Sequence, residues 1–172
     1  LYTKKEKISD RNHCSYFGIR QKNYAFYAET GMEFEPKQEC ETAGMVLYQN
    51  HENHLRMEIR KRAEENCFVV TACIHGQGGV HLGDTRYDRS GSTAGEGRQF
   101  FKIRMHCDRQ KARIWLFRDG RERLIAEDIS LLPYTTEEAG GFVGCTIGMY
   151  ASANGQDSSN YADFAWFVQN AV

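Results

Sequence analysis

Residues 160–167 read NYADFAWF, and together with residues 139–151, which read AGGFVGCTIGMYA, they decide the fold class. Both runs place apolar, aromatic or small residues at consecutive positions. An extended chain of this kind is apolar on its two faces, which is typical of a strand buried on both sides. The glycines fit positions where two backbones approach closely or where a strand bends. The two runs therefore indicate buried β-strands.

The rest of the chain alternates apolar and polar residues at the period of a β-strand. The longest alternating run has one face made of Tyr24, Phe26, Ala28, Thr30, Met32 and Phe34. Shorter runs, separated by turn-forming residues, cover residues 44–48, 55–59, 67–74, 101–105, 114–116 and 124–126. No window keeps an apolar period of 3.6 residues over several turns. The sequence therefore predicts an all-β protein of about 10 to 12 antiparallel strands in two packed sheets.

Strict alternation along these strands assigns a set of large side chains to the core between the sheets. The set comprises Phe34, Leu47, Ile59, Ile103, Ile114, Phe164 and Trp166. Arg56, Glu58 and Arg60 fall on the face opposite Ile59. Exposed charges are common on strands, and these three are also suited to polar contacts with a ligand.

Length and composition favour one soluble globular domain. The chain has 172 residues, of which 41% are apolar and 26% charged. We expect residues 1–14, which are polar and mixed in charge, to be a linker or N-terminal extension, and residues 15–172 to form a single domain. The net charge of −1 argues against a nucleic-acid or anionic-membrane partner. No apolar stretch of 18 residues is present for a membrane span.

The six cysteines lie mostly inside apolar runs and show neither a C-x-x-C pair nor a zinc spacing. Such cysteines behave as small hydrophobic side chains. We expect buried reduced thiols, with structural disulfides and metal ligation as the alternatives. Reduced thiols favour a cytoplasmic location. The chain opens on Leu1 rather than Met, so a missing signal peptide says little about a longer parent.

Catalytic and metal-binding patterns are weak. Close acidic pairs such as Glu64-Glu65 and Glu137-Glu138 are adjacent in sequence, so on a strand their side chains diverge and cannot share acid and base roles. His51 and His54 flank a turn, which predicts a solvent-exposed hairpin rather than a metal site. Glycine-rich residues 76–79 and 91–97 predict turns without a phosphate-binding helix. We therefore expect no catalytic residue, no metal and no cofactor in this chain.

A sugar-binding surface is a stronger hypothesis. In the strand at residues 113–117, Trp115 and Phe117 lie on the face opposite Ile114 and Leu116. They either pack under another sheet or loop, or form a platform on which a sugar ring stacks. Trp115 is accordingly a candidate substrate-binding residue.

Five ordered motifs resemble the C-terminal β-sandwich domain of family 43 glycosyl hydrolases, the β-xylosidases and α-L-arabinofuranosidases. Residues 15–21 (SYFGIRQ) are similar to the family's S-F-x-G-R-R-Q strand, with Ile19 in place of its first arginine and Arg20 matching its second. Residues 32–36 (MEFEP) resemble M-x-F-x-P, and residues 41–50 (ETAGMVLYQN) resemble E-x-A-G-L-V-L-F-Q-N. The two closing runs at residues 139–151 and 160–167 complete the set.

The resemblance implies a concanavalin A-like jelly-roll that packs beside a catalytic five-bladed propeller supplied by the parent protein. In some members this domain lends one phenylalanine to the rim of the catalytic pocket. The matching residue here is Phe142, within residues 141–144 (GFVG), and packing in the core is its alternative role. With Arg20 and Trp115 it makes up the candidate substrate-binding set.

The leading function is then a non-catalytic accessory domain of a bacterial β-xylosidase or arabinofuranosidase that acts on hemicellulose. Xylo- or arabino-oligosaccharides are its expected small-molecule partners. The alternative is a stand-alone, lectin-like carbohydrate-binding protein, and an uncatalogued hydrolase comes third.

Overall fold

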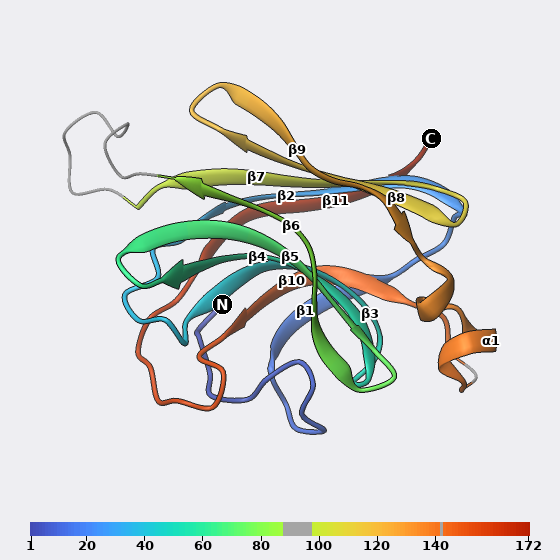
Figure 1. The fold of residues 1–172 in the computed structure, drawn as a ribbon, viewed down its shortest axis with the longest axis horizontal. Helices are drawn as coiled ribbons and strands as arrows, with labels where there is room; N and C mark the ends of the chain where they lie inside the picture. Colours follow the sequence, from blue (N-terminus) through green and yellow to red (C-terminus); the bar gives the residue numbers. More distant parts are fainter. Residues whose placement is uncertain (88–97, 142) are drawn as a thin grey trace.

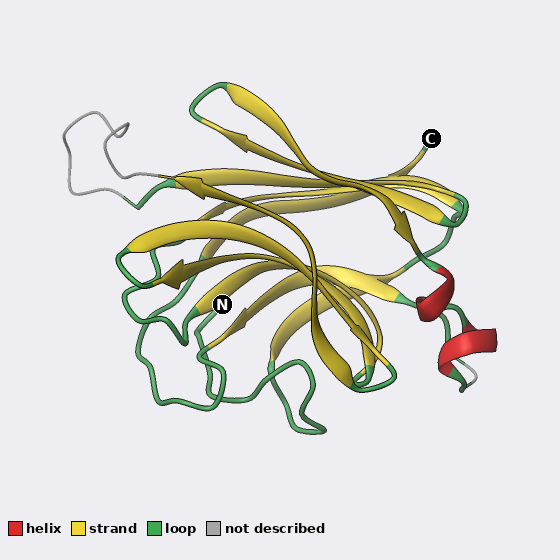
Figure 2. Cartoon of the chain, viewed as in Figure 1, coloured by secondary structure: helices red, strands yellow, loops and turns green. Residues whose placement is uncertain are grey.

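The computed structural model describes residues 1–87, 98–141 and 143–172 as two antiparallel sheets packed face to face (Figure 1). Among these residues, helix is confined to two short pieces between residues 131 and 140, drawn in red at the right of Figure 2. These pieces are η2 (Leu132–Tyr134) and α1 (Thr136–Ala139). The predicted all-β, two-sheet sandwich is confirmed.

The described residues form eleven strands, which divide six to five between the sheets. The six-stranded sheet has the order β1 (Ser15–Arg20), β10 (Thr146–Ser152), β3 (Thr42–Asn50), β4 (Asn53–Arg62), β5 (Glu65–Ile74) and β6 (Gln77–Tyr87). The five-stranded sheet has the order β11 (Asp163–Ala171), β2 (Ala25–Glu33), β7 (Phe100–Asp108), β8 (Lys111–Arg118) and β9 (Arg121–Ser130). The two closing runs of the sequence thus enter different sheets, β10 in one and β11 in the other.

The core lies between the two sheets, where the alternation of each strand places it. Five of the predicted core residues are at most 1% exposed: Phe34, Leu47, Ile59, Ile103 and Ile114. Phe164 is partly buried and packs against this cluster. Each of these side chains points inward because a strand puts alternate residues on one face.

The prediction for Trp166 was wrong. Phe164 pairs with Met32 and Trp166 pairs with the next residue of β2, Gly31. Ala165 is therefore an extra residue in a β-bulge, and a bulge turns the following side chain to the other face. Trp166 lies on the outer face and is 36% exposed.

Two further residues depart from the predicted pattern. Tyr24 precedes the first residue of β2 and is 85% exposed, so it does not extend the buried face. Glu58 lies on the outer face of β4, as predicted, but it is fully buried rather than exposed. Its carboxylate lies 3.7 Å from Arg56 and 3.8 Å from Arg60. The three charges therefore form a compact, largely buried group.

Residues 1–14, expected to be a linker or N-terminal extension, lie against the sandwich. The backbone amide of Thr3 donates to the carbonyl oxygen of Asn160, and that of Ala153 donates to Lys4. Ile8 is 2% exposed and packs with Tyr150 on the outer face of the six-stranded sheet. Ile8 of this segment therefore completes a small apolar cluster on the outer face of the sheet.

All six cysteines are free, and Cys67, Cys73, Cys107 and Cys145 are buried. The prediction of buried reduced thiols is confirmed for these four. Burial raises the pKa of Cys107 to about 12 and that of Cys145 to about 11. Such thiols are inert packing residues at neutral pH. In the described part of the chain, no helix is long and apolar enough to cross a membrane.

Candidate functional site

A glycine-rich loop joins α1 to β10 and contains residues 140–144. Gly140 has φ of 73° and Gly141 has φ of 87°, in the region that residues with a side chain rarely adopt. The side chain of Val143 is 55% exposed. The chain thus leaves α1 through a sharp turn and presents this loop at one end of the sandwich, at the right of Figure 1.

Two amide side chains from the end of β3 bond the loop and the last residue of α1 before it. Nε2 of Gln49 donates to the carbonyl oxygen of Val143 at 2.7 Å. Nδ2 of Asn50 donates to the carbonyl oxygen of Ala139 at 3.3 Å. Gln49 is only 5% exposed, so its bond is shielded from competing water.

The end of β1 holds the loop from the other side. The backbone amide of Gln21 donates to the carbonyl oxygen of Cys145 at 3.0 Å. Arg20 lies beside the loop, because a methyl group placed on Gly144 would be 3.7 Å from Nη1 of the guanidinium. Residues from the ends of two strands distant in sequence therefore converge on residues 140–145, which we call the glycine loop.

The three predicted site residues do not form one site in the structure. Arg20 is exposed and lies at the glycine loop. Phe142 belongs to the loop by sequence and lies outside the described residues. Trp115 is on β8 of the other sheet, where it pairs with Arg104. The structure therefore joins Arg20 to the loop and assigns Trp115 to a different surface.

His54 adds a buried neutral imidazole next to these anchors, which corrects the predicted solvent-exposed hairpin. It is 2% exposed and stacks on Tyr48 with ring centroids 6.2 Å apart. Burial and then the neighbouring Arg56 charge lower its pKa to about 4, so the ring is neutral at pH 7. Its Nδ1 lies 3.4 Å from the carbonyl oxygen of Asn50. Sequence alternation missed this burial because it does not show what covers the outer face of a sheet.

The groups at the glycine loop are suited to binding a ligand or a protein surface, and they do not form a catalytic site. The loop offers a guanidinium, amide side chains and exposed backbone, which can hydrogen-bond a hydroxyl-bearing ligand or a protein surface. Glu137 and Glu138 on α1 are exposed and adjacent, so they do not form a facing acid–base pair. Within the described residues, no three His, Cys, Asp or Glu side chains gather to hold a metal ion.

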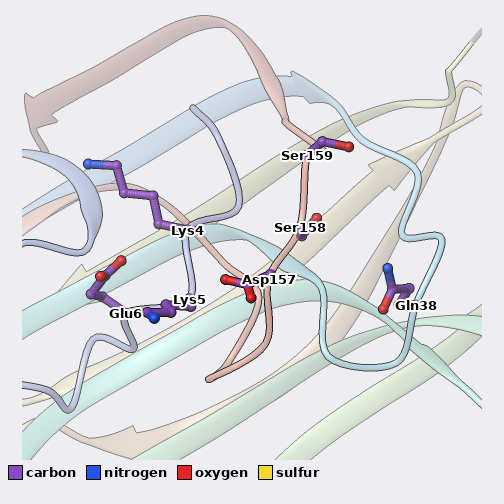
Figure 3. A pocket seen from close by; sticks show the side chains of 7 residues that line it. All are labelled: Lys4, Lys5, Glu6, Gln38, Asp157, Ser158 and Ser159. Carbon is purple, nitrogen blue, oxygen red and sulfur yellow. The ribbon is translucent and has the colours of Figure 1, made fainter.

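A hollow lies at the N-terminal segment and has a volume of about 560 Å³ (Figure 3). Its lining comprises Lys4, Lys5, Glu6, Gln38, Asp157, Ser158 and Ser159. Nearby, the buried carboxylate of Glu41 accepts hydrogen bonds from Asn160, Ser158 and two backbone amides. Burial acts to raise the pKa of Glu41, but these bonds outweigh it and lower the pKa. The contacts of Glu41 therefore serve to join two loops.

Comparison with known proteins gives one family. The family described as the β-xylosidase C-terminal concanavalin A-like domain matches residues 1–169. A xylosidase/arabinosidase of Butyrivibrio fibrisolvens is 40% identical over 172 residues, which are 100% of this chain and 31% of that protein. A non-reducing end α-L-arabinofuranosidase of Bacteroides ovatus, BoGH43B, is 29% identical over 153 residues, which are 89% of this chain and 27% of that protein. The chain therefore spans about a third of the length of these relatives or less.

Solved structures show the same fold. The structure of GH43B from the xyloglucan PUL of Bacteroides ovatus superposes with a TM-score of 0.89 at 23% identity, over 100% of this chain and 32% of that one. The GH43 protein BlXynB of Bacillus licheniformis gives a TM-score of 0.82 at 21% identity, over 100% of this chain and 32% of that one. In both, the matched sandwich is one part of a longer polypeptide.

Proposed function

Because the chain belongs to the family of β-xylosidase C-terminal concanavalin A-like domains, we propose that it is the non-catalytic accessory domain of a bacterial β-xylosidase or α-L-arabinofuranosidase acting on hemicellulose. The relatives that it matches are named for xylosidase, arabinosidase and arabinofuranosidase activity, and each is about three times as long as this chain or longer. A catalytic part of the same polypeptide accounts for the remaining length.

The proposed partner is a catalytic five-bladed propeller, and the glycine loop is the proposed point of contact with the rim of its pocket. The observation that carries this proposal is that Gln21 and Gln49 hydrogen-bond the loop, while Asn50 bonds Ala139 just before it and Arg20 lies beside it. A loop that Gln21 and Gln49 hydrogen-bond, with Asn50 bonding the residue just before it, is suited to placing one side chain accurately against another surface. Phe142 is the proposed rim residue, and Arg20 is proposed to contact the same surface.

The test compares three proteins: this chain alone, the catalytic part of a full-length protein that ends in this chain, and the full-length protein itself. We expect no release of aglycone from aryl xyloside or aryl arabinofuranoside by the chain alone, since no carboxylate pair is placed for acid and base roles. The full-length protein should exceed the catalytic part in kcat/KM, because the chain completes the pocket. Sustained turnover by the chain alone, abolished by mutating a single Asp or Glu, would contradict the proposal.

A further inference from the structure

The outer face of the five-stranded sheet carries several aromatic rings. This sheet is the upper layer in Figure 1, and its outer face points away from the other sheet. One cross-strand row contains Trp166, Gly31, Lys102 and Phe117. The adjacent row contains Val168, Glu29, Arg104, Trp115 and Leu124. We call these two rows, with Phe100 beside them, the aromatic face.

Gly31 makes room for the rings at one end of this face. A methyl group placed on Gly31 would be 2.6 Å from Nε1 of Trp166 and 2.8 Å from Cζ of Phe100. The indole and the phenyl ring therefore both lie close over the backbone of β2 at Gly31. Trp166 is 36% exposed and Phe100 is 45% exposed, so both rings remain open to solvent.

Charged side chains lie between the rings and hold them in place. Nζ of Lys102 lies 3.7 Å from the centroid of the Phe117 ring, and the guanidinium of Arg104 lies 4.7 Å from it. Glu29 pairs with both cations. These groups fix Phe117 by cation–π contacts and place hydrogen-bonding atoms beside that ring.

The alternation of rings and charges indicates whether the aromatic face binds a protein or a saccharide. Lys and Glu are depleted at protein–protein interfaces, whereas Glu29 and Lys102 occupy the centre of the aromatic face. A sugar has both kinds of surface: its C–H faces stack on aromatic rings, and its hydroxyl groups bond carboxylates and guanidinium groups. The distance from β11 to β8 crosses three strand spacings, about 14 Å in total, which suits several linked sugar rings.

We propose that the aromatic face binds a chain of the hemicellulose on which the parent acts, with Trp166, Phe100 and Trp115 as stacking residues. This inference rests on the proposed function for the identity of the polysaccharide. It assigns to the chain a second role, holding polymer at a surface separate from the glycine loop. The pairing of Glu29 with two cations within the face favours an uncharged ligand.

Intrinsic fluorescence tests the proposal directly, because the only two tryptophans of the chain, Trp115 and Trp166, both lie on this face. Titration of the chain with xylohexaose and with soluble arabinoxylan should change the emission saturably. Trp166→Ala and Phe100→Ala should each weaken binding at least tenfold, measured by calorimetry, with folding checked by circular dichroism. Phe17→Ala is the matched control, since Phe17 is 63% exposed on β1 of the other sheet, and it should bind normally.

Gly31→Ala tests the geometry while keeping every ring. The added methyl group would displace Trp166 and Phe100, so binding should fall as it does for Trp166→Ala. No saturable binding of either saccharide, or equal binding by Trp166→Ala and the Phe17→Ala control, would overturn the proposal. Self-association of the chain that Trp166→Ala abolishes would assign the face to a second copy and would also overturn it. The function proposed above would survive each of these failures, since its test measures turnover by the full-length protein.

Discussion

The side-chain amide of Gln49 donates a 2.7 Å hydrogen bond to the carbonyl oxygen of Val143, across 94 residues of sequence. Gln49 is buried at the end of β3, whereas the side chain of Val143 is more than half exposed. The packing of Val143 therefore does little to hold this part of the glycine loop. The bond from Gln49 fastens the loop to the six-stranded sheet.

We expect Gln49→Ala to lower the free energy of unfolding by about 1–3 kcal/mol, because it leaves the carbonyl of Val143 without its donor at a partly buried hydrogen bond. Urea denaturation of the purified chain measures this loss. Gln77→Ala, at an exposed position at the start of β6, is the matched control and should change stability by less than about 0.5 kcal/mol. Equal effects of the two variants would show that the Gln49 bond contributes nothing.

Sequence reasoning predicted the fold well where a strand alternates without interruption. Phe26, Ala28, Thr30 and Met32 are fully buried on β2, as the pattern requires. It failed at Trp166 because a single extra residue in a bulge reverses the faces, and no period-two pattern shows where a bulge falls. It also failed at Glu58, since burial of a charge depends on partners that the pattern does not identify.

The candidate site was only partly predictable. The resemblance pointed to Arg20 and to residues 141–144, and the structure brings Arg20 to that loop. It did not reveal that Gln49 and Asn50 hold the loop, because a hydrogen bond between residues some 90 positions apart leaves no local signal. The location of Trp115 on the other sheet likewise depends on the order of the strands.

His54 should make stability depend on pH. Its pKa is about 4 in the folded chain, against an ordinary value of 6.5, so below pH 6.5 the unfolded chain binds a proton that the folded chain does not. The free energy of unfolding should be unaffected by this group above pH 6.5 and should fall by about 3 kcal/mol as the pH drops from 6.5 to 4. His54→Gln should flatten this part of the curve of unfolding free energy against pH. Glu41, whose pKa is lowered from 4.5, adds its own loss of stability from about pH 4.5 downward, at the acid end of this window. An unchanged slope in His54→Gln would show that the ring titrates normally.

The buried charges around Glu58 should behave as one unit. Glu58→Ala leaves the guanidinium groups of Arg56 and Arg60 without their shared carboxylate, which should cost about 3–5 kcal/mol. The triple variant Glu58→Ala, Arg56→Met, Arg60→Met should recover part of this loss, because it removes the unpaired charges as well. Guanidinium denaturation measures both changes. A triple variant less stable than the single one would contradict this account.

Gly44 lies where strands β3 and β4 approach too closely for any side chain. A methyl group placed on Gly44 would be 2.0 Å from the carbonyl oxygen of Met57, which is backbone and cannot rotate away. Gly44→Ala should therefore destabilise the chain by about 1–3 kcal/mol or more, seen as a lower Tm. Gly78→Ala serves as the control, because the nearest atom to its methyl group is Sγ of Cys73 at 3.9 Å. Similar Tm values for the two variants would refute the close approach.

Phe142 lies outside the described residues, so its proposed role at the pocket rim is tested through function. In the full-length protein, Phe142→Ala should raise KM or lower kcat for aryl xyloside, because it removes a side chain that contacts the substrate pocket. The isolated chain should keep its Tm within roughly 2–4 °C, the change expected for about 1 kcal/mol in a chain of this length. Val80→Ala, at an exposed position on β6 outside the glycine loop, should leave both activity and Tm unchanged. A core phenylalanine would instead lose about 3–5 kcal/mol on truncation, so a large fall in the Tm of the isolated chain would place Phe142 in the core and exclude it from the rim.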